Sequence, residues 1–191
     1  MVNEKKLKAV IAYLAERTHP GKVKLFKLLY FADFTAYSER GQSITSETYV
    51  HFPMGPVPQA LYHDLREGHN TYVDMEFTTS GMPFPTQLMR PKPDVDLLVL
   101  SAEEKAILDR VIERYGPLSG ASLREITHRE IPYITTKPGE EIPYRLSLYR
   151  AAQKPTSEEI QRFTANTEFM HTLRQSLREL EQTNEPDHQV E

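Results

Sequence analysis

Histidine is the residue type in this chain with the most versatile chemistry, because imidazole can bind a metal or carry a proton near neutral pH. The 191 residues include seven histidines. His63 and His69 lie six positions apart with Gly68 between them, so a single helix face does not present both. No HExxH motif occurs, since the segment that begins at His128 contains an acid but lacks a second histidine. Because cysteine is also absent, we predict no metal site, no disulfide and no thiolate chemistry.

Acid–base catalysis would require the fold to gather polar side chains from separate segments. The candidates are Tyr30, Asp33, His63, Asp64 and His128. No sequence spacing joins them, and the glycine-rich and serine-containing motifs of nucleotide-binding proteins and hydrolases are absent. We therefore predict no catalytic residue and no cofactor, and an enzyme stays an alternative without a defined reaction. His128 also has a structural interpretation, because an imidazole at a helix C-terminus can hydrogen-bond free carbonyl groups.

The composition is that of an ordinary soluble protein, with 39% hydrophobic and 26% charged residues. No apolar run is long enough to span a bilayer and the N-terminus does not resemble a signal peptide, so we expect a cytoplasmic protein without a membrane partner. The net charge of −4 argues against a nucleic-acid partner. Residues 1–27 carry seven basic and two acidic groups, whereas residues 158–191 carry eight acidic and three basic groups. These ends are either solvated surfaces or regions that steer a charged partner.

The elements that must position these residues are mostly helices. Apolar periodicity and capping residues predict helices over 3–17, 22–41, 57–68, 101–116 and 119–128. An extended segment or short strand follows residue 42 and leads to a proline-rich loop, and two strands are expected at 71–78 and 86–91. Residues 129–144 are expected to be irregular. Because the strands are grouped rather than alternating with helices, we expect a predominantly helical α+β domain with a small antiparallel β-sheet.

The predicted helix over 22–41 is apolar on nearly every side, and such a helix lies inside a core rather than on it. Its apolar residues are Val23, Leu25, Phe26, Leu28, Leu29, Tyr30, Phe31, Phe34 and Tyr37. We expect it to be the central helix of the domain.

The C-terminal part of the chain contains a narrow apolar stripe at spacings of three and four residues. Its members are Met170, Leu173, Leu177 and Leu180, with Arg174 beside them. The stripe either packs on the protein's own core or forms an interface with another chain, which includes a homodimer. We expect a domain over residues 1–150, a helix within 151–182 that packs on the domain or on a partner, and a disordered tail over 183–191.

Three separated blocks together resemble the Panacea domain, the SocA-like antitoxin family of bacteria and phages. They are KLFKLLYFADF (24–34), GQSITSETYVHFPMGPVPQALYHDL (41–65) and YGPLSGASLREITHREIPYITTKPGEEIPY (115–144). The resemblance covers about residues 5–150. Two departures are Met54, where the family commonly has tyrosine, and Pro132-Tyr133, where an aromatic residue, often tryptophan, usually follows.

The resemblance implies which residues form the family scaffold. The matching positions are Lys24, Leu25, Lys27, Leu28, Leu29, Tyr30 and Phe31 in the central helix, Gly55, Pro56 and Val57 in a turn, and Thr127 and His128 at a helix end. The resemblance also implies an antitoxin that neutralises a cognate toxin by direct protein–protein binding. The alternative that it implies is an adaptor that delivers the toxin to a ClpXP-type protease. We propose the stripe residues Met170, Leu173, Arg174, Leu177 and Leu180, together with the basic N-terminal end, as partner-contact candidates.

Overall fold

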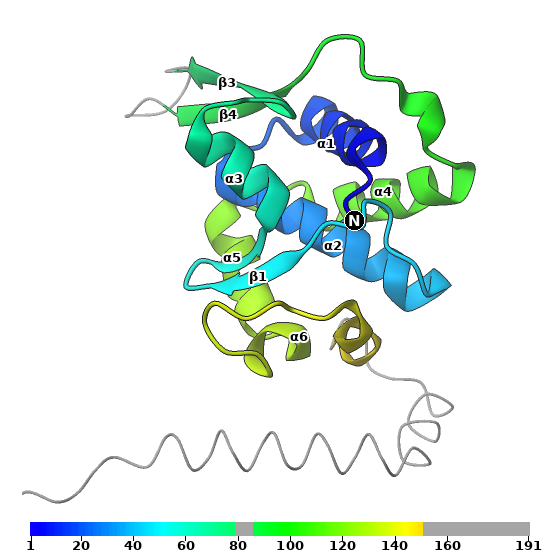
Figure 1. The fold of residues 1–191 in the computed structure, drawn as a ribbon, viewed down its shortest axis with the longest axis vertical. Helices are drawn as coiled ribbons and strands as arrows, with labels where there is room; N and C mark the ends of the chain where they lie inside the picture. The colour runs from blue at the N-terminus through cyan, green and yellow to red at the C-terminus, as the bar shows by residue number, and fades with distance from the viewer. Residues whose placement is uncertain (79–85, 151–191) are drawn as a thin grey trace, which may run out of the picture. The chain divides into compact units, whose positions relative to one another are not determined.

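A buried central helix organises the domain. The computed structural model describes residues 1–78 and 86–150. Helix α2 (Lys22–Arg40) has buried residues in every turn from Leu25 to Ala36. It packs against the surrounding elements, which are α1 (Glu4–Thr18), α4 (Ala102–Tyr115), α5 (Gly120–His128), β2 (Gly55–Pro58) and the 3₁₀ helix η2 (Tyr144–Tyr149) (Figure 1). The predicted central helix, apolar on nearly every side, is therefore confirmed.

The strands of the described residues form two separate antiparallel hairpins. Strand β1 (Tyr49–Phe52) pairs with β2, and β3 (Val73–Thr78) pairs with β4 (Thr86–Pro91). The β3–β4 pair lies where the sequence predicted two strands. The backbone of β4 also bonds the α1–α2 connection, since the Met89 N–H donates to the Pro20 carbonyl at 2.8 Å. This architecture confirms the predicted predominantly helical α+β class.

The β1–β2 hairpin is a more regular structure than the sequence suggested. The predicted proline-rich loop is a tight turn at Pro53 and Met54, as expected, and it leads into a return strand that the sequence did not predict, in which Pro56 pairs with His51. Proline is tolerated in β2 because this strand lies at the edge of a two-stranded sheet and its missing N–H breaks no central ladder. Helix α3 (Gln59–Glu67) follows directly, two residues later than the predicted start.

The stretch predicted to be irregular also contains regular structure. It includes the one-turn helix α6 (Ile131–Ile134) and a backbone segment that pairs with the outer edge of β1. The His51 N–H donates to the Glu140 carbonyl at 2.8 Å, and the Ile142 N–H donates to the Tyr49 carbonyl at 2.7 Å. Strand β1 is therefore held on both edges, which fixes its position against α2 and α6.

Aromatic rings fill the space around α2. Phe31 stacks on Tyr115 of α4 with a centroid distance of 3.9 Å, and Tyr30 and Phe34 contact Tyr49 of β1 edge-on. Such rings bury large apolar areas and prefer these offset or edge-to-face geometries. The aromatic residues of α2 therefore join the helix to both the helical and the β-hairpin parts of the domain.

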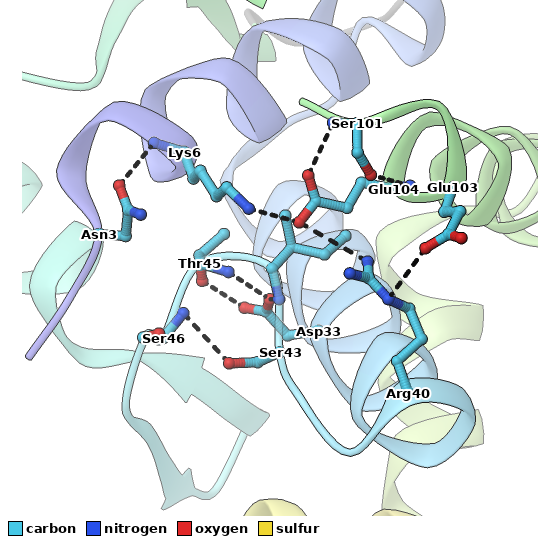
Figure 2. A network of polar contacts seen from close by, with 11 residues as sticks. Asn3, Lys6, Asp33, Arg40, Ser43, Thr45, Ser46, Ser101, Glu103 and Glu104 are labelled. Carbon is cyan, nitrogen blue, oxygen red and sulfur yellow. Dashed lines mark hydrogen bonds and ion pairs between the residues drawn. The ribbon is translucent and has the colours of Figure 1, made fainter. Parts of the chain in front are cut away.

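Polar networks fix the ends of the helices (Figure 2). Asn3 caps α1 by accepting from the Lys6 N–H, and Ser101 forms the predicted capping box with Glu104 at the start of α4. The buried Glu104 carboxylate also accepts from Lys6 Nζ at 2.6 Å. Arg40 at the end of α2 lies 3.6 Å from Glu103. These contacts tie α1, α2 and α4 together at one end.

A buried aspartate holds the loop between α2 and β1. Asp33 accepts hydrogen bonds from the backbone of Ile44 and Thr45 at 2.9 Å each and from the Thr45 hydroxyl (Figure 2). It also accepts from the Tyr49 hydroxyl at 2.8 Å. Burial raises the pKa of the Asp33 carboxyl, and these hydrogen bonds oppose the rise. Asp33 is thus a structural group that secures the entry to the β1–β2 hairpin.

Residues Met1–Arg150 form one compact unit. The predicted helix over 151–182 and the predicted tail over 183–191 lie outside the described residues. Among the helices of the described part, none is both long enough and apolar enough to cross a membrane.

Candidate functional site

Gly55 lies where the β1–β2 hairpin, α2 and α5 come together. Its φ of +89° is in the region that favours glycine, and an added Cβ would lie 2.8 Å from Thr127 Oγ1 and 2.9 Å from Lys27 Nζ. The Pro56 carbonyl accepts a hydrogen bond from Lys27 Nζ at 2.7 Å. We call Lys27, Gly55, Pro56, Thr127 and His128 the motif cluster, because these residues of three separate sequence blocks meet here.

Lys27 is the buried cation of the motif cluster. Lys27 is only 1% exposed, and most of the other buried residues of α2 are apolar. Burial, together with the nearby charge of Arg124, lowers the pKa of the Lys27 ammonium to about 7. Lys27 therefore anchors the hairpin to α2 through the Pro56 carbonyl, and its charge is sensitive to pH near neutrality.

A stack of rings flanks the cluster. The His128 ring stacks on Tyr133 with a centroid distance of 4.5 Å and an interplanar angle of 9°, and the His51 ring stacks on Tyr133 at 3.8 Å. The Tyr133 hydroxyl donates to the Phe52 carbonyl at 2.9 Å, which fixes α6 beside the hairpin turn. The Pro132-Tyr133 pair departs from the family pattern, but Tyr133 still supplies an aromatic ring at this place in the chain. His128 lies at the C-terminal end of α5 as predicted, but its Nε2 is buried and has no hydrogen-bond partner among the described residues.

The structure adds Arg124 and Met54 to this site. Arg124 precedes His128 by one helical turn, and its guanidinium contacts the Met54 sulfur at 3.5 Å. The Arg124 Nε is buried and has no hydrogen-bond partner in the described part of the chain. Sequence reasoning did not select Arg124, although its four-residue spacing from His128 places both on one face of the helix.

Several basic side chains lie close together at this site. Burial lowers the pKa of His128, and Lys27, Arg124 and His51 lower it further, while Glu125 opposes them. Burial is also the main cause of the lowered pKa of His51. pKa values that are shifted by burial together with specific charged neighbours are more frequent at functional sites than elsewhere.

The other scaffold positions of α2 lie in the core or hold a helix end. Leu25, Leu28, Leu29 and Phe31 have no exposed surface. Lys24 Nζ donates to the Gly116 carbonyl at the end of α4 at 2.5 Å. Tyr30 is fully enclosed, and burial raises the pKa of its hydroxyl well above the ordinary value. Val57 is 5% exposed in β2.

The acid–base candidates occupy structural positions. Asp33 holds the loop before β1, and Asp64 accepts from the Thr71 N–H at 2.8 Å and so ties the segment after α3 to that helix. His63 is exposed on α3, whereas Tyr30 is a fully buried residue of α2. No group of three potential metal ligands occurs among the residues that the structure describes. The partner-contact candidates Met170, Leu173, Arg174, Leu177 and Leu180 lie outside the described residues.

One comparison with known proteins identifies a relationship. Residues 25–132, more than half of the chain, match the family model described as antitoxin SocA-like, Panacea domain. The match contains every residue of the motif cluster, as well as Arg124 and Met54. No curated protein and no solved structure matches the chain significantly.

Proposed function

Because the chain belongs to the SocA-like antitoxin family with its Panacea domain, we propose that it neutralises a cognate toxin by binding it directly. The observation that carries this proposal is the family match over residues 25–132, which includes the central helix and the motif cluster. We propose that this binding takes place in the cytoplasm.

The roles of the polar groups within the matched region support binding rather than a reaction. Asp33, Glu47 and Asp64 each accept backbone hydrogen bonds that hold loops and helix ends. Lys27 holds the hairpin carbonyl of Pro56. These groups stabilise the fold, which agrees with a function in binding another protein.

The test is genetic and begins with the neighbouring reading frames. Expression of the toxin gene alone should stop growth, and co-expression of this chain should restore it. The two proteins should then co-purify as a complex of defined stoichiometry. If none of the neighbouring frames is harmful, and no harmful protein associates with the purified chain, the antitoxin assignment is wrong for this protein.

The same assay separates direct neutralisation from delivery to a ClpXP-type protease. Direct binding predicts that rescue persists in cells without the protease and that the toxin stays abundant. Delivery predicts that rescue and toxin loss both require the protease. For an enzyme, single alanine substitutions of His63, Asp64 and His128 should abolish activity while the protein stays folded. If rescue from the toxin survives all three substitutions, acid–base chemistry at these residues is not the function.

A further inference from the structure

Arg124 is held in a position that leaves its charge without an acidic partner. Arg40, Arg90 and Arg110 each lie within ion-pair distance of a glutamate, as does the buried Arg150. Arg124 has no carboxylate at that distance among the described residues.

Burial distinguishes Arg124 from other arginines that lack an acid. Arg66, Arg129 and Arg145 also have no acidic partner in the described part of the chain, but they are exposed, so water solvates them. Arg124 is half-buried and its Nε is shielded from solvent. The Arg124 Nε–H is therefore unsatisfied, because it has lost water without gaining a hydrogen-bond acceptor.

The Met54 thioether lies where a strong hydrogen-bond acceptor for Arg124 could bind. The Met54 sulfur lies 3.5 Å from the Arg124 guanidinium, and thioether sulfur is only a weak acceptor. The Met54 side chain is 46% exposed at the hairpin turn. Its unbranched chain can therefore move aside without opening the core.

The groups that act electrostatically on one another around Arg124 are mostly basic. Lys27 and His128 lie close enough to Arg124 for their pKa values to be lowered by it. Glu125 is the acidic residue that acts on His128, but it is exposed and does not pair with Arg124. The Thr127 hydroxyl donates to the Arg124 carbonyl at 2.8 Å, so this turn of α5 is firmly held.

We propose that Arg124 binds a carboxylate of the toxin at the turn of the β1–β2 hairpin, in the place that the Met54 thioether occupies. This inference rests on the proposed function and names the chemistry of the partner. An arginine fork binds a carboxylate in a bidentate manner, and the half-buried position strengthens such a pair relative to one in water. The partner therefore presents an acidic side chain to the motif cluster.

The first experiment uses the full chain and does not depend on the toxin. A capped pentaglutamate peptide is titrated into the protein while the Arg124 Nε–H and His128 ring signals are followed by NMR. We expect saturable shifts that sodium chloride of equal ionic strength and a pentalysine peptide do not produce. Arg124→Gln should remove the shift of the His128 ring signals, whereas the charge-matched control Arg66→Gln should keep the shifts of both groups.

Met54→Ala is a second variant that leaves the guanidinium intact. It removes the thioether from the proposed carboxylate position and should tighten pentaglutamate binding several-fold. If pentaglutamate shifts no signal beyond the salt control, or shifts Arg124→Gln equally, the carboxylate site does not exist.

The second experiment measures toxin affinity once rescue has identified the toxin. Arg124→Glu should weaken binding by about 30-fold or more, because a half-buried charge pair is replaced by repulsion. Arg66→Glu should stay within about twofold, as expected of an exposed charge. Arg124→Lys should be intermediate, since it keeps the charge but loses the fork. If folded Arg124→Glu binds the toxin as tightly as the wild type, the inference is overturned while the antitoxin function stands.

Discussion

At the scale of single residues, Gly55 combines an unusual backbone conformation with a close approach of side chains. We expect Gly55→Ala to lower the free energy of unfolding by about 2–4 kcal/mol, since the methyl group adds overpacking to backbone strain. Gly139→Ala is the matched control, because Gly139 has a similar φ of +86° and open space around the added Cβ. Urea unfolding should show a cost of about 1–2 kcal/mol for the control. Equal costs for the two variants would mean that the contacts with Thr127 and Lys27 are unimportant.

Lys27 makes the stability of the domain depend on pH. The pKa of its ammonium is lowered from 10.5 to about 7 in the folded protein. Between these values the unfolded chain binds the proton and the folded chain does not, so the contribution to stability rises with pH by at most about 1.4 kcal/mol per unit. Below pH 7 both states are protonated and the cost of burying the charge is fully present.

Lys27→Met should therefore reduce the rise of unfolding free energy with pH. The measurement is urea unfolding at several pH values between 7 and 9.5, with the exposed Lys5→Met as control. The control should follow the wild type at every pH. Parallel curves for wild type and Lys27→Met would show that Lys27 keeps its proton in the folded protein.

The sequence identified the residues of the motif cluster by resemblance but could not reveal their physical roles. Lysine and aspartate are seldom buried. Apolar periodicity alone therefore does not distinguish the buried Lys27 and Asp33 from the exposed charged residues of the same helix. Their positions depend on partners distant in sequence, namely the Pro56 carbonyl and the loop at Ile44 and Thr45. Arg124 was missed for the same reason, since its significance comes from Met54, seventy residues away.

At the scale of elements, an ion pair joins η2 to the start of α6. Arg150 donates to Glu130 Oε1 at 3.0 Å, and both side chains are less than 10% exposed. Arg150 also donates to the Thr35 hydroxyl of α2 at 3.1 Å. We expect Arg150→Met to lower the free energy of unfolding by about 3–5 kcal/mol, because it leaves a buried carboxylate without a partner.

A double-mutant cycle isolates that contribution. Glu130→Gln combined with Arg150→Met should be more stable than Arg150→Met alone, since no buried charge remains unpaired. The measurement is again urea unfolding, with Arg110→Met as the control for an exposed ion pair. If the two substitutions are additive, Glu130 and Arg150 do not stabilise each other.

The elements that local patterns specify were predicted well. Asn3, Gly41, Gly68 and the Ser101–Glu104 box mark helix ends that the structure places within a few residues of the predicted ones. The return strand β2, helix α6 and the strand-like segment near Glu140 were missed as regular structure, although a short strand at β1 was one of the expected alternatives. These elements depend on pairing between distant segments of proline-rich sequence. In such sequence, neither hydrophobic periodicity nor secondary-structure propensity indicates where the elements lie.

At the scale of the whole molecule, the apolar stripe from Met170 to Leu180 is a proposed contact with the toxin, and this rests on the proposed function. In the full chain, we expect Leu173→Ala combined with Leu177→Ala to weaken toxin binding by about 10-fold or more, because truncated apolar anchors lose buried contact. Calorimetric titration of the toxin provides the measurement. The control is Gln175→Ala combined with Ser176→Ala, which alters polar positions between the same two leucines.

The two other interpretations of the stripe predict different results for the same variants. If the stripe packs on residues 1–150, the leucine variants should lower the thermal unfolding temperature of the free protein and leave toxin affinity nearly unchanged. If it forms a homodimer, sedimentation should show a dimer for the wild type and a monomer for the leucine variants. Toxin contact instead predicts unchanged unfolding and unchanged mass in the free protein, with the loss confined to the complex. A full-affinity complex with both leucines replaced would exclude the stripe as a toxin-binding surface, and recognition would then depend on the domain that contains Arg124.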